Sequence, residues 1–115
     1  MKKKISSFVF LFLLLLPVSV FAYTYSDLIN GEVSREDISN AGTNFLISVI
    51  TNSPGSSGTG ANVVDAENGS VLGYATVFTA SDVVAELIGM GANVNYLNDI
   101  PGRTTGMSAL MLAAS

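Results

Sequence analysis

Apolar residues follow two different patterns along the chain. Residues 8–16 form an unbroken apolar run, whereas the remainder alternates short apolar segments with polar ones. Between residues 81 and 91 the apolar positions recur at helical spacing and form one face, made of Val83, Val84, Leu87 and Ile88. Ser81 precedes them as the expected N-cap, and Gly91 can end the helix in the left-handed conformation. This segment therefore predicts an amphipathic α-helix.

The sequence between residues 23 and 50 also favours helices. Ser34-Arg35-Glu36-Asp37 fits a capping box with two acids in the first helical turn, and Gly42 is typical of the turn that ends such a helix. The next apolar segment, residues 45–50, has a β-branched content that would also permit a strand. Residues 53–60 are rich in glycine and serine and predict a flexible loop.

The C-terminal part contains two more short apolar segments. Residues 70–77 are small and apolar, and residues 108–114 begin another short helix. Between them, residues 96–105 form a polar loop that contains Pro101-Gly102. These patterns predict an all-α fold.

The order of short helix, tight turn, second helix and extended turn resembles the ankyrin repeat. Gly106-Met107-Ser108-Ala109-Leu110-Met111-Leu112-Ala113-Ala114 is similar to the opening of the family's first helix, Gly-x-Thr-Pro-Leu-His-x-Ala-Ala. Residues 83–95 resemble the ending of its second helix, Val-Val-x-x-Leu-Leu-x-x-Gly-Ala-Asp-Val-Asn. The resemblance implies a solenoid of helix-turn-helix repeats with hairpin loops, in which small alanines allow close packing of neighbouring helices.

The spacing of the repeat motif gives the expected organisation of the chain. Leu72 and Leu110 occupy equivalent positions 38 residues apart, about five more than the family period of roughly 33 residues. The excess predicts a lengthened hairpin finger in residues 96–105. Before residue 68 the match is weak, because residues 51–59 cannot hold a normal second helix.

We therefore expect four parts. They are a signal peptide in residues 1–22, a helical N-terminal cap and degenerate repeat with a Gly/Ser loop in residues 23–67, an ankyrin-type repeat with a long finger in residues 68–105, and the first helix of an incomplete repeat in residues 106–115. A solenoid truncated in this way indicates a partial sequence, a gene remnant without independent function, or a domain completed by another chain.

The first 22 residues have the three regions of a secretory signal. Met1-Lys2-Lys3-Lys4 is basic, the apolar run follows, and Val20 and Ala22 suit the cleavage site, so that the mature chain would begin at Tyr23. The apolar run is much shorter than the roughly 20 residues of a spanning helix, and a membrane anchor is the less favoured alternative. We expect an exported protein, periplasmic or secreted, that contacts the membrane only through the signal if it stays uncleaved.

Composition limits the chemistry of the mature chain. It retains Arg35 and Arg103 against nine acidic residues, a net charge of −7, which argues against binding to nucleic acid. The absence of cysteine and histidine removes the commonest metal ligands and the usual catalytic nucleophile and base. No catalytic residue, metal site or cofactor is predicted. The carboxylate pairs Asp65–Glu67 and Asp82–Glu86 leave a small exported hydrolase as an alternative.

The resemblance implies a protein-interaction module without catalysis, because partners of the family bind the fingers and the concave face of the first helices. The partner would be a protein of unknown identity. Transferred to this sequence, the expected contacts are Tyr74, Tyr96, Leu97, Asn98, Asp99, Ile100 and Arg103. Phe78 is better explained as a core residue.

Overall fold

Helices make up most of the described chain, as the sequence predicts. The computed structural model describes residues 22–100 and 105–114. Within these residues it contains six α-helices, one short 3-10 helix and a two-stranded sheet. The predicted signal peptide lies outside the described residues except for Ala22, and so does Arg103. Both therefore stay predictions.

Three short helices form the N-terminal part: α2 (Tyr25–Asn30), α3 (Arg35–Ala41) and α4 (Thr43–Thr51). Thr24 and Ser34 each close a capping box with the aspartate three residues later, so the capping box predicted at Ser34 is confirmed. Gly42 ends α3 with a φ of 93° and leads directly into α4. The apolar segment that would have permitted a strand is therefore helical.

A helical hairpin follows a loop that contains the 3-10 helix η1 (Gly60–Asn62). Its two arms are α5 (Val71–Val77) and α6 (Ser81–Gly89). Ser70 caps α5 by accepting a hydrogen bond from the N–H of Gly73 at 2.9 Å. The predicted N-cap at Ser81 is wrong, because the left-handed turn at Thr79, with a φ of 56°, makes Ala80 the cap and Ser81 the first helical residue.

The long predicted loop contains a small antiparallel sheet. Strand β1 (Asn98–Asp99) pairs with β2 (Thr105–Met107), with an irregular register between Asn98 and Asp99. Helix α7 (Ala109–Ala114) follows β2 and packs against α5. The all-α prediction is therefore correct for the helices but omitted this sheet.

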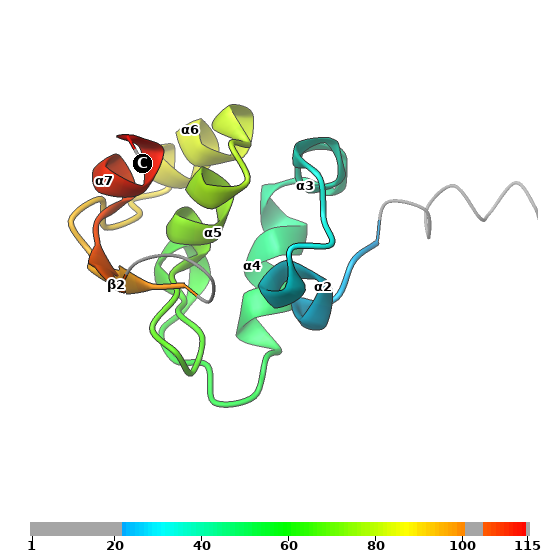
Figure 1. Ribbon diagram of the computed structural model, residues 1–115, viewed down its shortest axis with the longest axis horizontal. Helices are drawn as coiled ribbons and strands as arrows, with labels where there is room; N and C mark the ends of the chain where they lie inside the picture. Colours follow the sequence, from blue (N-terminus) through cyan, green and yellow to red (C-terminus); the bar gives the residue numbers. More distant parts are fainter. Residues whose placement is uncertain (1–21, 101–104, 115) are drawn as a thin grey trace, which may run out of the picture.

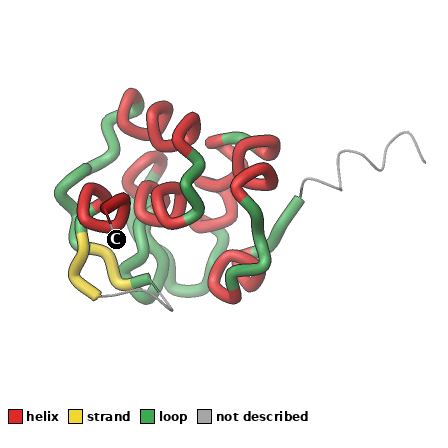
Figure 2. The backbone as a smooth tube through the Cα atoms, turned by 45° about the horizontal axis from the view of Figure 1, so that its top comes forward, coloured by secondary structure: helices red, strands yellow, loops and turns green. Residues whose placement is uncertain are grey.

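The helices are arranged in chain order (Figure 1), with α2 and α3 at one end, α5 and α6 in the middle and α7 at the other end. The two strands lie beside α7 in a second view (Figure 2). Residues 52–59 contain no helix, as predicted. No second helix therefore follows α4 in these residues. Helix α3, which precedes α4 in the chain, contacts α6.

The core runs through all of these helices. Its largest fully buried apolar side chains are Tyr74, Ile38, Leu46, Ile50, Leu72, Leu87, Val63, Val71 and Val83. Tyr23 closes the N-terminal end, where its ring packs edge to face on Phe45 with the centroids 4.9 Å apart. Within residues 22–100 and 105–114, none of the helices has the length and apolar character that a membrane span requires.

Candidate functional site

Asp65, which is 2 % exposed, is a polar side chain of the interior that accepts four hydrogen bonds. The hydroxyl of Tyr25 donates to Oδ2 at 2.6 Å, and the hydroxyl of Tyr74 donates to the same oxygen. The backbone N–H groups of Glu67 and Gly69 donate to Oδ1 at 3.0 and 2.7 Å. An ionised carboxylate has about four acceptor positions, and at Asp65 four donors of the chain itself use them.

The tyrosines around Asp65 stay protonated over the normal pH range. Burial and then the hydrogen bond to the Asp65 carboxylate raise the pKa of Tyr25 to about 12. The same two causes, burial first, raise the pKa of Tyr74 still further. Each hydroxyl is therefore a permanent donor. The carboxylate ties α2, through Tyr25, and α5, through Tyr74, to the loop before α5.

The other predicted carboxylate pair, Asp82 and Glu86, links α6 to α3 and α4. The hydroxyl of Ser39 donates to Asp82 at 2.8 Å, and the hydroxyl of Thr43 donates to Glu86. The hydrogen bond from Ser39 holds the pKa of Asp82 below its usual value. Asp82 and Glu86 thus face α3 and α4 rather than a cleft. In residues 22–100 and 105–114, no group of three or more acidic side chains is placed to hold a metal ion.

Three of the predicted contact residues belong to the interior instead. Tyr74 is completely buried, and Asn98 and Ile100 are 1 % and 5 % exposed. The amide oxygen of Asn98 accepts from both the N–H and the hydroxyl of Ser70, at 2.7 and 2.6 Å. A Cβ atom on Gly73 would overlap this amide and approach Ile100. These three side chains are therefore not surface contacts.

The other predicted contacts among the described residues, Tyr96, Leu97 and Asp99, lie on the surface of the finger. Leu97 is 56 % exposed, whereas Tyr96 and Asp99 are partly buried. The Tyr96 hydroxyl lies 3.5 Å from the amide oxygen of Asn68. Among the described residues, the finger thus offers few accessible side chains of the predicted set, and Leu97 is the most exposed of these.

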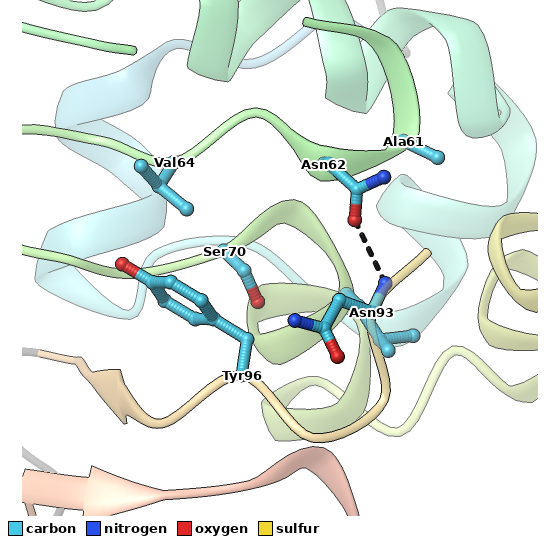
Figure 3. A pocket seen from close by; sticks show the side chains of 7 residues that line it. Ala61, Asn62, Val64, Ser70, Asn93 and Tyr96 are labelled. Atoms are coloured by element: carbon cyan, nitrogen blue, oxygen red, sulfur yellow. Dashed lines mark hydrogen bonds between the residues drawn. The ribbon is translucent and has the colours of Figure 1, made fainter. Parts of the chain in front are cut away.

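A small pocket of about 270 Å³ lies between the loop before α5 and the start of the finger. Figure 3 shows that Asn62 and Asn93 meet across it, with the Tyr96 ring at one side. The Asn62 amide accepts from the Asn93 N–H at 2.7 Å and donates to the Gly91 carbonyl at 3.2 Å. The chain itself therefore supplies hydrogen-bond partners for the Asn62 amide. These two hydrogen bonds link the turn at Asn62 to the turn at residues 91–93.

A larger apolar groove of about 560 Å³ lies between α6, the turn after it and α7. Its apolar lining consists of Val84, Ile88, Val94, Ala109, Leu110 and Ala113. The polar side chains of Thr76 on α5 and of Thr79, Ser81, Asn95 and Ser108 complete the lining. Leu110 is 79 % exposed and Ile88 is 49 % exposed, so large side chains remain uncovered here.

The sequence predicted no site in this groove. The sequence places Ile88 on the single apolar face of its helix and Leu110 at a repeat position. In the structure, α6 buries Val83 and Leu87 and leaves Ile88 exposed in the groove. The signal that could have revealed the groove is the width of the apolar face of α6, of which α3, α4 and α5 fully bury only Val83 and Leu87.

Comparison of the chain with models of protein families, with curated proteins and with solved structures finds no match.

Proposed function

We propose that this chain is an exported protein-interaction module of the ankyrin-repeat type and that its partner binds in the apolar groove between α6 and α7. The observation that carries the proposal is the exposure of Leu110 and Ile88 beside each other in a groove of about 560 Å³. Contiguous exposed apolar side chains with a polar rim mark interaction sites in soluble proteins. Their burial by a partner would release about 25 cal/mol per Å² of apolar surface.

Several features support the ankyrin-type architecture. Helices α5 and α6 form a hairpin of seven and nine residues. Gly91 follows α6 with a φ of 91°, the left-handed conformation expected at the end of a second helix. An extended hairpin and α7 then follow, and α7 packs on α5 as the first helices of adjacent repeats would.

Site-specific photocrosslinking in the exporting cell tests the proposal. A photoreactive phenylalanine analogue is placed at Leu110, at Ile88, at Leu97 on the finger, or at Asn30 at the opposite end of the molecule. All four side chains are exposed, so none of the substitutions disturbs the core. We expect an adduct with another polypeptide at Leu110 and Ile88 and none at the other two positions.

The four positions also separate the alternatives. An adduct at Leu97 alone would assign binding to the finger and reject the groove. Failure of all four positions to give an adduct in the exported protein would contradict the interaction role. Export itself is checked by whether the mature chain, beginning at Tyr23, is found outside the cytoplasm.

A further inference from the structure

We propose that Asn30 is a site of spontaneous deamidation in the folded protein, whereas Asn68 is held unreactive by the carboxylate of Asp65. The sequence contains two Asn-Gly pairs, at residues 30–31 and 68–69. Such pairs are prone to this reaction because glycine has no side chain to hinder ring closure. Since both pairs have the same chemistry, the fold decides which of them reacts.

Deamidation needs no reagent other than water. The backbone nitrogen of the glycine loses its proton and attacks Cγ of the asparagine. The new N–Cγ bond forms as the Cγ–Nδ2 bond breaks, and the side-chain nitrogen leaves with a proton as ammonia. Water then opens the cyclic imide at either carbonyl, which yields aspartate or isoaspartate. The reaction therefore requires a glycine N–H that can be released and an asparagine backbone that can rotate.

The second Asn-Gly pair meets neither requirement. The buried N–H of Gly69 donates to Oδ1 of Asp65 at 2.7 Å, and the carboxylate charge opposes an anion on that nitrogen. The Asn68 N–H donates to the Asp65 carbonyl at 3.1 Å, and the Asn68 carbonyl accepts from the Asp99 N–H at 3.1 Å. A Cβ atom on Gly69 would lie 2.7 Å from the completely buried ring of Tyr74. Rotation of this turn therefore disturbs the core.

The first pair lies at the exposed C-terminal end of α2. Asn30 is the last residue of this six-residue helix, and both Asn30 and Gly31 are exposed. The Gly31 N–H donates to carbonyls of the last turn, with 3.3 Å to that of Leu28. The Asn30 amide donates to the Ser26 hydroxyl at 3.2 Å on the surface. Water can replace these bonds, and helix ends fray at little cost in free energy. Fraying frees both reacting groups while the core stays folded.

Conversion of Asn30 would weaken the attachment of α2. The new carboxylate lies at the C-terminal end of the helix, where the helix dipole is negative and a negative charge is unfavourable. An isoaspartate adds a methylene group to the backbone and disturbs the left-handed turn at Gly31, whose φ is 71°. Tyr25 of the same helix donates to Asp65 at 2.6 Å. The modification thus marks aged copies of the chain by loosening the link between α2 and the core.

Trypsin separates the two pairs for measurement, because Arg35 lies between them. The full chain is incubated folded and in guanidinium chloride, and the digests are analysed by mass spectrometry, with enzymatic methylation to detect isoaspartate. Each rate in the folded chain is divided by the rate at the same residue in the unfolded chain. We expect this ratio to be at least about tenfold lower for Asn68 than for Asn30, because reaction at Asn68 requires opening of the core. Asn30→Gln keeps the amide, and its longer side chain closes the ring more slowly, so the first pair should stay unmodified.

A charge-removing substitution tests the role of Asp65. Asp65→Asn should raise the rate at Asn68 by about tenfold or more and leave the rate at Asn30 unchanged. Asp82→Asn removes the same charge from an exposed residue and should change neither rate. Circular dichroism checks that both variants fold. If Asp65→Asn does not fold, hydrogen exchange in the unsubstituted protein replaces it: the Gly69 N–H should exchange at least about tenfold more slowly than the Gly31 N–H.

Several results would overturn the proposal. Equal ratios for the two pairs would mean that the fold does not discriminate between them. An unmodified Asn30, after a time that converts the unfolded chain, would show that the end of α2 does not fray. An unchanged rate at Asn68 in folded Asp65→Asn, or rapid exchange of the Gly69 N–H, would remove the protective role of the carboxylate.

Discussion

Tyr74→Phe removes one hydroxyl from a completely buried position and changes little else. The ring remains, and the Asp65 carboxylate keeps three of its four donors, namely Tyr25 and the N–H groups of Glu67 and Gly69. The substitution therefore measures how strongly one buried hydrogen bond to a carboxylate holds α5 to the loop before it.

The expected magnitude follows from the burial of the bond. A hydrogen bond to a charged group contributes about 1.5–3 kcal/mol, and full burial of Tyr74 favours the upper part of that range. For a domain of this size the melting temperature falls by roughly 4–8 °C per kcal/mol. Tyr25→Phe should cost less, about 0.5–1.5 kcal/mol, because Tyr25 is only partly buried.

Tyr96→Phe is the matched control, because it removes the same atom from a hydroxyl that lies 3.5 Å from Asn68 at the surface. It should change the free energy of unfolding by no more than about 0.5 kcal/mol. Urea unfolding monitored by circular dichroism gives all three values. Since Tyr25 and Tyr74 share Oδ2 of Asp65, the double variant should be non-additive.

A cost for Tyr74→Phe within about 0.5 kcal/mol of the Tyr96→Phe value would refute this reasoning. It would mean that the hydrogen bond between Tyr74 and Asp65 contributes little to stability and that apolar packing alone holds α5 in place. Equal costs for Tyr25→Phe and Tyr74→Phe would show instead that the exposure of the hydroxyl has no influence on its bond to the carboxylate.

Three further predictions concern packing and pH. Gly73→Ala should destabilise the protein by about 1–3 kcal/mol in thermal unfolding, because its Cβ would overlap the amide of Asn98; a neutral effect would contradict the close approach. Leu87→Ala should cost about 2–5 kcal/mol and Ile88→Ala less than about 1 kcal/mol in urea unfolding, because only Leu87 is fully buried; equal costs would mean that Ile88 is covered. Stability should fall between pH 10 and 12, because the unfolded chain releases the Tyr25 proton near pH 10 and the folded chain retains it to a pKa of about 12. The slope for this group is at most about 1.4 kcal/mol per pH unit, reduced by its partial exposure; Tyr25→Phe should remove this part of the slope, whereas the part that comes from Tyr74, whose pKa is raised further, should remain.

Local sequence signals predicted several helix ends in this chain. The predicted capping box at Ser34 forms, and the structure caps α5 with the Ser70 hydroxyl in a similar way, since each cap needs only a backbone group three residues away. Gly42 and Gly91 end helices because glycine adopts positive φ without steric cost. The prediction at Ser81 failed because the preceding turn at Thr79 takes a left-handed conformation that β-branched residues rarely adopt.

The interior and the surface could not be separated by the same local signals. Tyr74 and Asn98 were expected to be contacts because of their place in the repeat pattern. Each is buried because a partner distant in sequence satisfies its polar atom: Asp65 for the tyrosine, and Ser70 together with the Met107 carbonyl for the asparagine. Burial of a polar side chain depends on such partners.

By itself, the sequence determined that most of the chain is helical, and it placed the capping box at Ser34 and the glycines that follow α3 and α6, because these depend on residues within one or two turns of each other. Only the tertiary structure decided that α3 contacts α6 and that Asp65 accepts four hydrogen bonds. It also decided that Ile88 and Leu110, 22 residues apart, line one groove. Those outcomes depend on which faces the helices present to one another. Such a choice is set by packing across the whole core rather than by any single segment.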